Sequence, residues 1–283
     1  MTALATRIGE VREATRAVRR RGGRIALVPT MGALHEGHLS LIRAARAEAE
    51  FVVVSLFVNP MQFGPGEDYA TYPRPLEKDL ELCRAEDVNL VFAPPPEEMR
   101  AAEAATTVHV ARLTETMCGE SRPGHFDGVA TVVAKLLNIA QPDVVYFGEK
   151  DAQQLAVLCR MVRDLDFPVE VRASPLVRDS DGLALSSRNV NLSAEERERA
   201  LVLGRALAEV REAILAGERD APLLGRALRR QIEEAGGTDL EYAVLVDPDT
   251  LEPLREIRDR VLVAVAARVG RTRLIDNVLL RDL

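Results

Sequence analysis

Apolar and polar positions in the first part of the chain follow two different periods. An apolar run at 25–28 is followed by a loop with two glycines, and residues 39–49 then carry apolar side chains three and four apart. A second apolar run occupies 51–58. This order predicts a strand, a loop, a helix and a strand, which form a βαβ unit with a right-handed crossover. Pro29 is expected to end the first strand because it has no N–H for the ladder.

Strands and helices continue to alternate up to about residue 176. This alternation predicts an α/β fold with a doubly wound parallel sheet, which binds ligands outside the carboxyl ends of its strands. The interval from 106 to 113 alternates in polarity and predicts a further strand, with an edge position as one option. The other expected elements are a helix over 1–23 ending at the two glycines, a helix at 76–86, a strand at 89–94, a helix at 128–140, a strand at 143–148, a helix at 152–165 and a short strand at 168–176.

The pattern changes after residue 176. Two amphipathic helices are expected at about 194–217 and 221–237, and three strands with turns between them follow. We therefore expect two domains, 1–176 with the parallel sheet and 177–283 as a smaller C-terminal α+β domain. Ser193 is suited to cap the first of these helices with its hydroxyl oxygen, and Glu195 and Glu196 in the first turn suit the helix dipole.

Composition narrows the class of protein. The chain has 283 residues and a net charge of −7, which argues weakly against nonspecific binding to nucleic acid. It has no apolar run near the ~20 residues needed to span a membrane, so a cytoplasmic protein is the default expectation. Three scattered cysteines suggest neither a disulfide framework nor a four-cysteine metal site.

Candidate chemistry is concentrated in segments that follow predicted strands. His35 and His38 lie at the start of a predicted helix, where N–H groups and the helix dipole favour an anion such as phosphate. Lys150 is one of only three lysines among 37 basic residues and follows another strand. Ser186, Ser187 and Arg188 near the domain junction offer two hydroxyls and a forked cation to phosphate.

The same residues also allow simpler interpretations. The two histidines could cap a helix or lie on the surface, and Lys150 could be an ordinary loop lysine. A zinc protease site is disfavoured because the histidines are three apart rather than four and have no obvious third ligand. The sequence contains no Walker-type phosphate loop, and no G-x-G-x-x-G follows the first strand.

The interval from 62 to 75 is rich in glycine and proline and predicts a long loop, which is usually functional and could act as a lid. Asn59 precedes this interval and Gln62 begins it, again after a strand end. Arg122 and His125 could contact a ligand or order a turn, and both alternatives stay open. Asp79 is a metal candidate by position only.

Five motifs in register resemble the pantothenate synthetase (pantoate–β-alanine ligase) family over essentially the whole chain. They are PTMGALHEGHLSLI, FVNPMQF, RPGHFDGV, YFGEKDAQQL and LSSRN. The first is also similar to the HIGH signature of the nucleotidyltransferase superfamily. Two departures are visible: Leu185 stands where methionine is usual, and Ala152 where an aromatic residue is expected.

The resemblance implies a reaction of ATP, (R)-pantoate and β-alanine that gives pantothenate, AMP and pyrophosphate through a pantoyl adenylate. It also implies a Rossmann-like N-terminal domain, a C-terminal lid domain, a homodimer, and Mg²⁺ with the ATP. His38, His35 and Lys150 would be catalytic. Residues implied to bind ATP are Pro29, Thr30, Met31, Gly32, Ala33, Leu34, His35, Glu36, Gly37, His38, Gly148, Glu149, Lys150, Asp151, Val177, Leu185, Ser186, Ser187 and Arg188. Residues implied to bind pantoate are Gln62, Gln154, Met31 and Asn59, and Gln62 would also bind β-alanine.

Two other functions remain compatible with the sequence. One is a related nucleotidyltransferase that makes a dinucleotide, against which the glutamine pair and the FVNPMQF loop argue. The other is a noncatalytic nucleotide-binding regulator, for which the histidines would be dispensable.

Overall fold

The computed structural model describes residues 1–100 and 103–283, and these form two compact units. Unit 1 comprises residues 1–149 and 157–175, and unit 2 comprises residues 150–156 and 176–283. The expected boundary near Val177 stays a prediction. Each unit is described by itself below.

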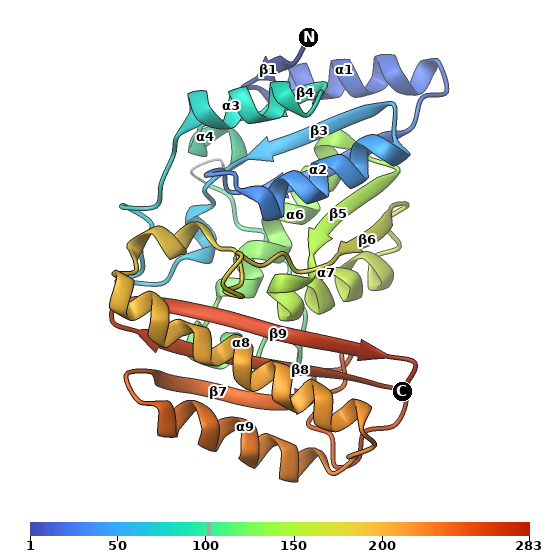
Figure 1. The fold of residues 1–283 in the computed structure, drawn as a ribbon. Coiled ribbons are helices and arrows are strands. Elements are labelled where there is room, and N and C mark those ends of the chain that lie inside the picture. The colour runs from blue at the N-terminus through green and yellow to red at the C-terminus, as the bar shows by residue number, and fades with distance from the viewer. Residues whose placement is uncertain (101–102) are drawn as a thin grey trace. The chain divides into compact units, whose positions relative to one another are not determined.

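Unit 1 is built on a six-stranded parallel sheet in the order β1-β4-β3-β2-β5-β6 (Figure 1). The central strands are apolar on both faces, as expected for a parallel sheet covered by helices on each side. The strands are β1 (Ala3–Ala5), β2 (Ile25–Thr30), β3 (Phe51–Leu56), β4 (Leu90–Phe92), β5 (Val144–Gly148) and β6 (Glu170–Ser174).

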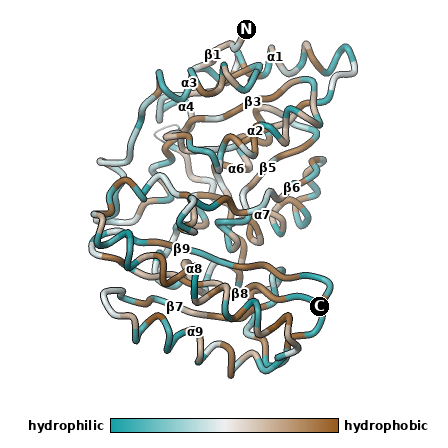
Figure 2. Tube along the Cα trace, in the orientation of Figure 1, coloured by the Kyte–Doolittle hydropathy of each residue, from teal (hydrophilic) through white to brown (hydrophobic). Residues whose placement is uncertain are grey.

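Helices cover the two faces of this sheet, and the apolar stretches of Figure 2 follow its strands. Helices α2 and α3 share a buried cluster with alternate residues of β2 and β3, while α1 and α6 pack together against the other face. The helices along this part of the chain are α1 (Ile8–Arg20), α2 (Glu36–Glu48), α3 (Leu76–Ala85), α4 (Pro96–Met99), α5 (Cys118–Ser121), α6 (His125–Ala140) and α7 (Ala152–Asp164), with 3-10 turns η1 (Pro60–Gln62) and η2 (Glu149–Asp151).

The strand order places a topological switch point between β2 and β5. The chain proceeds from β2 to β3 and β4 in one direction, and from β5 to β6 in the other. Parallel sheets of this kind bind ligands at the carboxyl ends of the strands beside such a point. The loop after β2 and the turn after β5 therefore begin at the same edge of the sheet. The strand order confirms the doubly wound parallel sheet predicted from the sequence.

Three local predictions were wrong. The interval 106–113 forms no strand: the Val108 N–H donates to the Thr131 hydroxyl and His109 pairs with Asp127, so the segment bonds to α6 instead of a sheet. Pro29 lies within β2 rather than ending it. Its nitrogen lies on the side of β5, where the ladder with β2 ends at Leu27, so no hydrogen bond is lost. The helix predicted over 1–23 begins only at Ile8, because residues 3–5 form the short strand β1, which pairs with β4.

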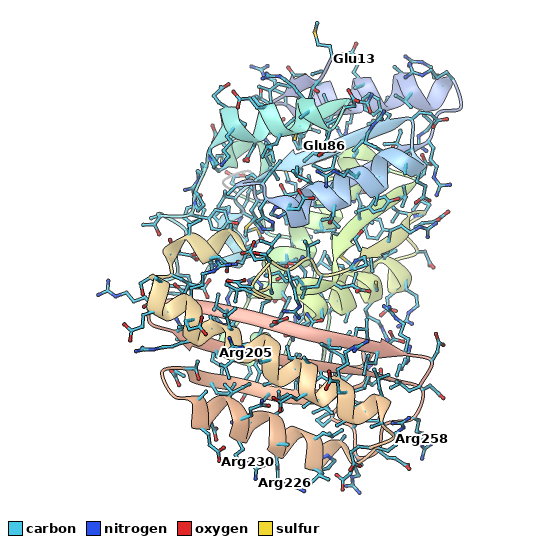
Figure 3. All side chains as sticks on the ribbon, in the orientation of Figure 1. Glu13, Glu86, Arg205, Arg226, Arg230 and Arg258 are labelled. Carbon is cyan, nitrogen blue, oxygen red and sulfur yellow. The ribbon has the colours of Figure 1, made fainter. Side chains whose placement is uncertain are left out.

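Unit 2 contains an antiparallel sheet in the order β7-β8-β9 with α8 and α9 packed on it. Leucine, isoleucine and valine side chains from both helices and from β8 form its buried cluster. Charged side chains such as Arg205 and Arg230 extend from the outer surfaces of these helices (Figure 3). The elements are η3 (Ser187–Asn191), α8 (Ala194–Leu215), α9 (Ala221–Ala235), β7 (Asp239–Val246), β8 (Arg260–Val269) and β9 (Thr272–Arg281).

Between residues 1 and 100 and between 103 and 283, no helix is long and apolar enough to cross a membrane.

Gly128 allows α6 to approach η1 closely. A Cβ atom at this position would lie 2.3 Å from the carbonyl oxygen of Met61 and 2.7 Å from the Gln62 nitrogen. Neither backbone atom can move as a side-chain end would. Glycine at this position therefore fixes Gln62 against α6.

We expect Gly128→Ala to lower the free energy of unfolding by roughly 1–3 kcal/mol, because overpacking forces the backbone of η1 to shift. Gly9→Ala in α1 is the matched control, since a Cβ there meets nothing within 4 Å. It should leave stability unchanged or raise it by about 0.5–1 kcal/mol. Denaturant unfolding of both variants measures the difference, and equal stabilities would contradict the packing argument.

Candidate functional site

The loop after β2 is held by one buried carboxylate. Asp79 of α3 is 2% exposed, and its two oxygens accept the N–H groups of Ala33 and Leu34, each at 2.8 Å. Gly32 has φ of +82° and lies so close that a Cβ would be 2.9 Å from the Asp79 oxygen. Burial raises the pKa of Asp79, and the two N–H groups act in the opposite direction. Asp79 therefore fixes the path of the chain from β2 to α2.

His35 and His38 cap α2 and hold each other. His35 Nδ1 accepts the Gly37 N–H at 3.2 Å, and His38 Nδ1 accepts the His35 N–H at 3.4 Å. Their ring centroids are 4.1 Å apart. Because Nδ1 is the acceptor in both rings, the neutral form of each carries its proton on Nε2. Two Nε2–H donors are thus presented at the positive end of a helix, where negative charge is favoured.

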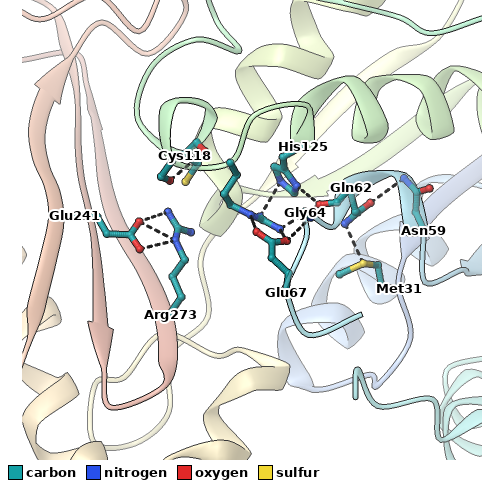
Figure 4. A network of polar contacts seen from close by, with 11 residues as sticks. Met31, Asn59, Gln62, Gly64, Glu67, Cys118, His125, Glu241 and Arg273 are labelled. Atoms are coloured by element: carbon teal, nitrogen blue, oxygen red, sulfur yellow. Dashed lines mark hydrogen bonds and ion pairs between the residues drawn. The ribbon is translucent and has the colours of Figure 1, made fainter. Parts of the chain in front are cut away.

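Gln62 is oriented from both ends of its amide (Figure 4). Its Nε2 lies 3.0 Å from the Met31 sulfur, and its Oε1 accepts from Asn59 Nδ2 at 3.1 Å. The Asn59 amide also donates to the Gly128 carbonyl at 3.0 Å. Gln62 and Asn59 are both buried, so their amides are fixed rather than freely rotating. Three of the four residues predicted to bind pantoate are therefore in one hydrogen-bonded group.

Arg122 and His125 hold the backbone of Gln62 to the following loop. His125 Nδ1 lies 2.7 Å from the Gln62 carbonyl oxygen, to which it donates, and its Nε2 accepts from Arg122 at 3.1 Å. Arg122 also forms a fork with both oxygens of Glu67, at 2.7 and 2.6 Å. Burial tends to raise the pKa of Glu67, but the Arg122 guanidinium outweighs this and the pKa is lowered. These contacts show that Arg122 and His125 order the segment around Gln62. A contact of either residue with a ligand stays an open alternative.

A cavity of about 230 Å³ lies beside the 62–75 segment, at the carboxyl ends of β3 and β4. Met31, Gly32 and Asp79 line one side of it, and Tyr69 and Arg74 line another. Arg74 lies over the Tyr69 ring, 5.1 Å from its centroid, and donates to the Tyr69 carbonyl. Movement of the 62–75 segment would therefore change the space next to Met31.

Other predicted site residues belong to unit 2. Lys150 lies in η2 with its ammonium 3.6 Å from the Asp151 carboxylate, and Gln154 lies half-buried in the first turn of α7. Val177 and Leu185 are paired, because the Leu185 N–H donates to the Val177 carbonyl at 3.0 Å. Ser186 caps η3 by accepting the Arg188 N–H. That these residues act on the same ligand as His35, His38 and Gln62 stays a prediction.

Sequence patterns missed most of the residues that orient this site. Asp79 was singled out only as a metal candidate, and Glu67 and Gly128 were not singled out. The charge of Arg122 in a turn-rich loop was a usable signal, but its partner Glu67 is 55 residues away. Among the described residues, no group of three or more histidine, cysteine, aspartate or glutamate side chains could hold a metal ion.

Comparison with known proteins gives consistent matches over nearly the whole chain. The family model described as pantoate-beta-alanine ligase matches residues 3–279. The pantothenate synthetase of Moorella thermoacetica is 56% identical over 273 residues, covering 96% of each chain. A crystal structure of pantothenate synthetase from Thermus thermophilus has a TM-score of 0.92 at 49% identity, covering 98% of each chain. The ligase from Francisella tularensis, complexed with beta-gamma ATP and β-alanine, has a TM-score of 0.78 at 32% identity and covers 99% of this chain and 98% of that one.

The pairing of Glu67 with Arg122 predicts a pH-dependent stability. We expect Glu67→Gln to cost roughly 1.5–3 kcal/mol at pH 7, because it removes a charge-assisted fork from a guanidinium that is 15% exposed. The folded-state pKa of Glu67 is lowered, so its contribution is present above the ordinary value of 4.5 and is lost as the pH falls through the folded-state value.

The difference in unfolding free energy between the unsubstituted protein and Glu67→Gln should therefore shrink as the pH falls below 4.5. Glu13→Gln, on the exposed surface of α1 (Figure 3), is the control and should show no such trend. A difference that stays constant with pH would mean that the fork does not stabilise the fold.

Proposed function

The chain belongs to the pantoate-beta-alanine ligase family, whose activity condenses pantoate with β-alanine using ATP, and on that premise we propose how its residues divide the reaction. The proposal follows a pantoyl-adenylate route: the pantoate carboxylate attacks the α-phosphate, pyrophosphate leaves, and the amine of β-alanine then displaces AMP. The observation that carries it is the mutual capping of His35 and His38, which presents two Nε2–H donors at the start of α2.

The first step builds negative charge on the phosphoryl oxygens and on the departing pyrophosphate. Catalysis of such a step depends on positioning and electrostatic stabilisation rather than on a protein nucleophile. His35 and His38 supply N–H donors within the favourable field of a helix N-terminus. We assign His38 as the proton donor to the phosphate and the whole segment 29–38 to ATP binding.

Cationic and hydroxyl donors come from residues of unit 2. Lys150 supplies a compact ammonium for the developing charge, and Ser186, Ser187 and Arg188 bind the outer phosphates. Gly148, Asp151, Val177 and Leu185 complete the predicted ATP contacts.

The amide side chains bind the other two substrates. Gln62 and Gln154 can bind the hydroxyl and carboxylate groups of pantoate without adding a competing nucleophile, and Asn59 and Met31 fix the rotamer of Gln62. Gln62 also contacts β-alanine. The adenylate must be protected from water, and the 62–75 loop and the C-terminal domain are the proposed lids.

Mg²⁺ is proposed to enter with ATP and to be held mainly by phosphate oxygens and water, as is usual for this ion. Asp79 does not fit as its ligand, because both carboxylate oxygens accept backbone N–H groups. We assign no step of the reaction to the ion. A homodimer and a cytoplasmic location remain predictions.

Isotope exchange between pyrophosphate and ATP tests the adenylate route. Exchange should require pantoate and proceed without β-alanine, because only the first half-reaction is reversed. Exchange in the absence of pantoate, or none with it, would overturn the proposal.

We expect Lys150→Ala to lower the rate of adenylate formation by ~10²–10³, by analogy with loss of one oriented donor in a dry site. Lys150→Arg should restore the charge but only part of the rate, because a planar guanidinium cannot replace a compact ammonium. Lys78→Ala, at an exposed position of α3, is the control and should retain full activity. Near-native turnover of Lys150→Ala would remove Lys150 from the mechanism.

We expect His38→Ala to slow adenylate formation more than synthesis from preformed pantoyl adenylate and β-alanine. The second step does not develop charge on the leaving pyrophosphate, so it depends less on this donor. His109→Ala, whose imidazole pairs with Asp127, should leave both half-reactions unchanged. Equal losses in both half-reactions of His38→Ala would show that the residue mainly maintains the helix cap.

A further inference from the structure

Two consecutive residues of β9 hold both predicted phosphate-binding segments of unit 2. Asp276 has a side chain that is 4% exposed, and its two oxygens accept from Arg178 at 2.7 and 2.8 Å. Asn277 donates its Nδ2–H to the Lys150 carbonyl at 2.9 Å. Each contact joins segments that are far apart in the sequence.

The Asp276 contact positions the segment that leads to Ser186. Arg178 pairs with Ala184 in an antiparallel bridge and also donates to the Gly182 carbonyl at 3.0 Å. The bridge is flanked by the hydrogen bond between Leu185 and Val177. The Asp276 carboxylate therefore anchors the base of a short hairpin that ends where the Ser-Ser-Arg sequence begins.

The Asn277 contact positions the turn that carries Lys150. A hydrogen bond to the Lys150 carbonyl fixes the peptide plane between Lys150 and Asp151, and hence the direction in which the Lys150 side chain leaves the backbone. Consecutive strand residues point to opposite faces of a sheet. Gly204 of α8 lies near Asp276, so the hairpin is held on the helix-covered face and Lys150 on the other.

We propose that Asp276 and Asn277 are positioning residues that set Lys150 and the Ser186–Arg188 segment in register with each other through the rigid strand β9. The inference rests on the proposed function, since it assumes that Lys150 and Arg188 act on the triphosphate. Neither Asp276 nor Asn277 contacts ATP in this scheme. Their effect reaches the reaction only through the groups that they hold.

A double-mutant cycle on adenylate formation tests the Asn277 arm, because a positioning residue loses its effect once the group that it positions is gone. Asn277→Ala alone should reduce the rate roughly 10- to 100-fold, as a misplacement of about 1 Å can do. In a Lys150→Ala background, Asn277→Ala should reduce it by less than about twofold. Losses that multiply in the double variant would overturn the proposal.

The Asp276 arm provides the crossed comparison. Arg178→Lys replaces the fork by a single point charge and should raise KM for ATP, whereas in an Arg188→Ala background it should have little further effect. Asn277→Ala should remain costly in that background, and Arg178→Lys should remain costly with Lys150→Ala. General destabilisation would give the same loss in every background, and that result would also overturn the proposal.

Asn138→Ala is the matched control, because Asn138 likewise donates its amide to a carbonyl, that of Ala134 at 3.0 Å, but within α6. It should leave the rate and KM unchanged. If Asn277→Ala does not fold, Asn277→Ser takes its place in the cycle. Full activity of Lys150→Ala would refute the proposed function itself, whereas an inactive Lys150→Ala with multiplying losses would refute only the positioning role.

Discussion

The buried carboxylate of Asp79 is the constraint on which the loop after β2 depends. Without it, the N–H groups of Ala33 and Leu34 would lack partners in a largely buried loop, which is costly. The positive φ values of Gly32 and Ala33 also need surroundings that hold them. The start of α2, and with it the imidazole of His35, therefore follows from a side chain on a different helix.

A second set of contacts fixes the side-chain amide and the backbone carbonyl of Gln62. The Gln62 side chain is held by Met31 and Asn59, and its carbonyl is held by His125 and Arg122. In each case a polar group that would be expensive to bury alone has a hydrogen-bond partner. Such a network specifies one arrangement of the Gln62 amide.

These arrangements suit a reaction whose catalyst is an array of donors. No residue of the proposed mechanism forms a covalent bond to substrate, so rate depends on how accurately the imidazoles, Lys150 and the hydroxyls are placed. That dependence explains why many interactions around them join distant segments. It also makes residues such as Asn277, remote in sequence from Lys150, candidates for strong effects on rate.

The sequence by itself determined the parallel sheet, the α+β character of the second part of the chain and the chemical identity of the candidate donors. Apolar runs and helical periods are local signals, and histidines at a helix start or a lysine after a strand can be recognised from neighbours alone. Only the tertiary structure decided that 106–113 bonds to α6 rather than to a sheet, that Asp79 holds a loop, and that Arg122 pairs with Glu67. These outcomes depend on which buried polar groups find partners, and a local pattern carries no information about partners that folding brings from distant positions.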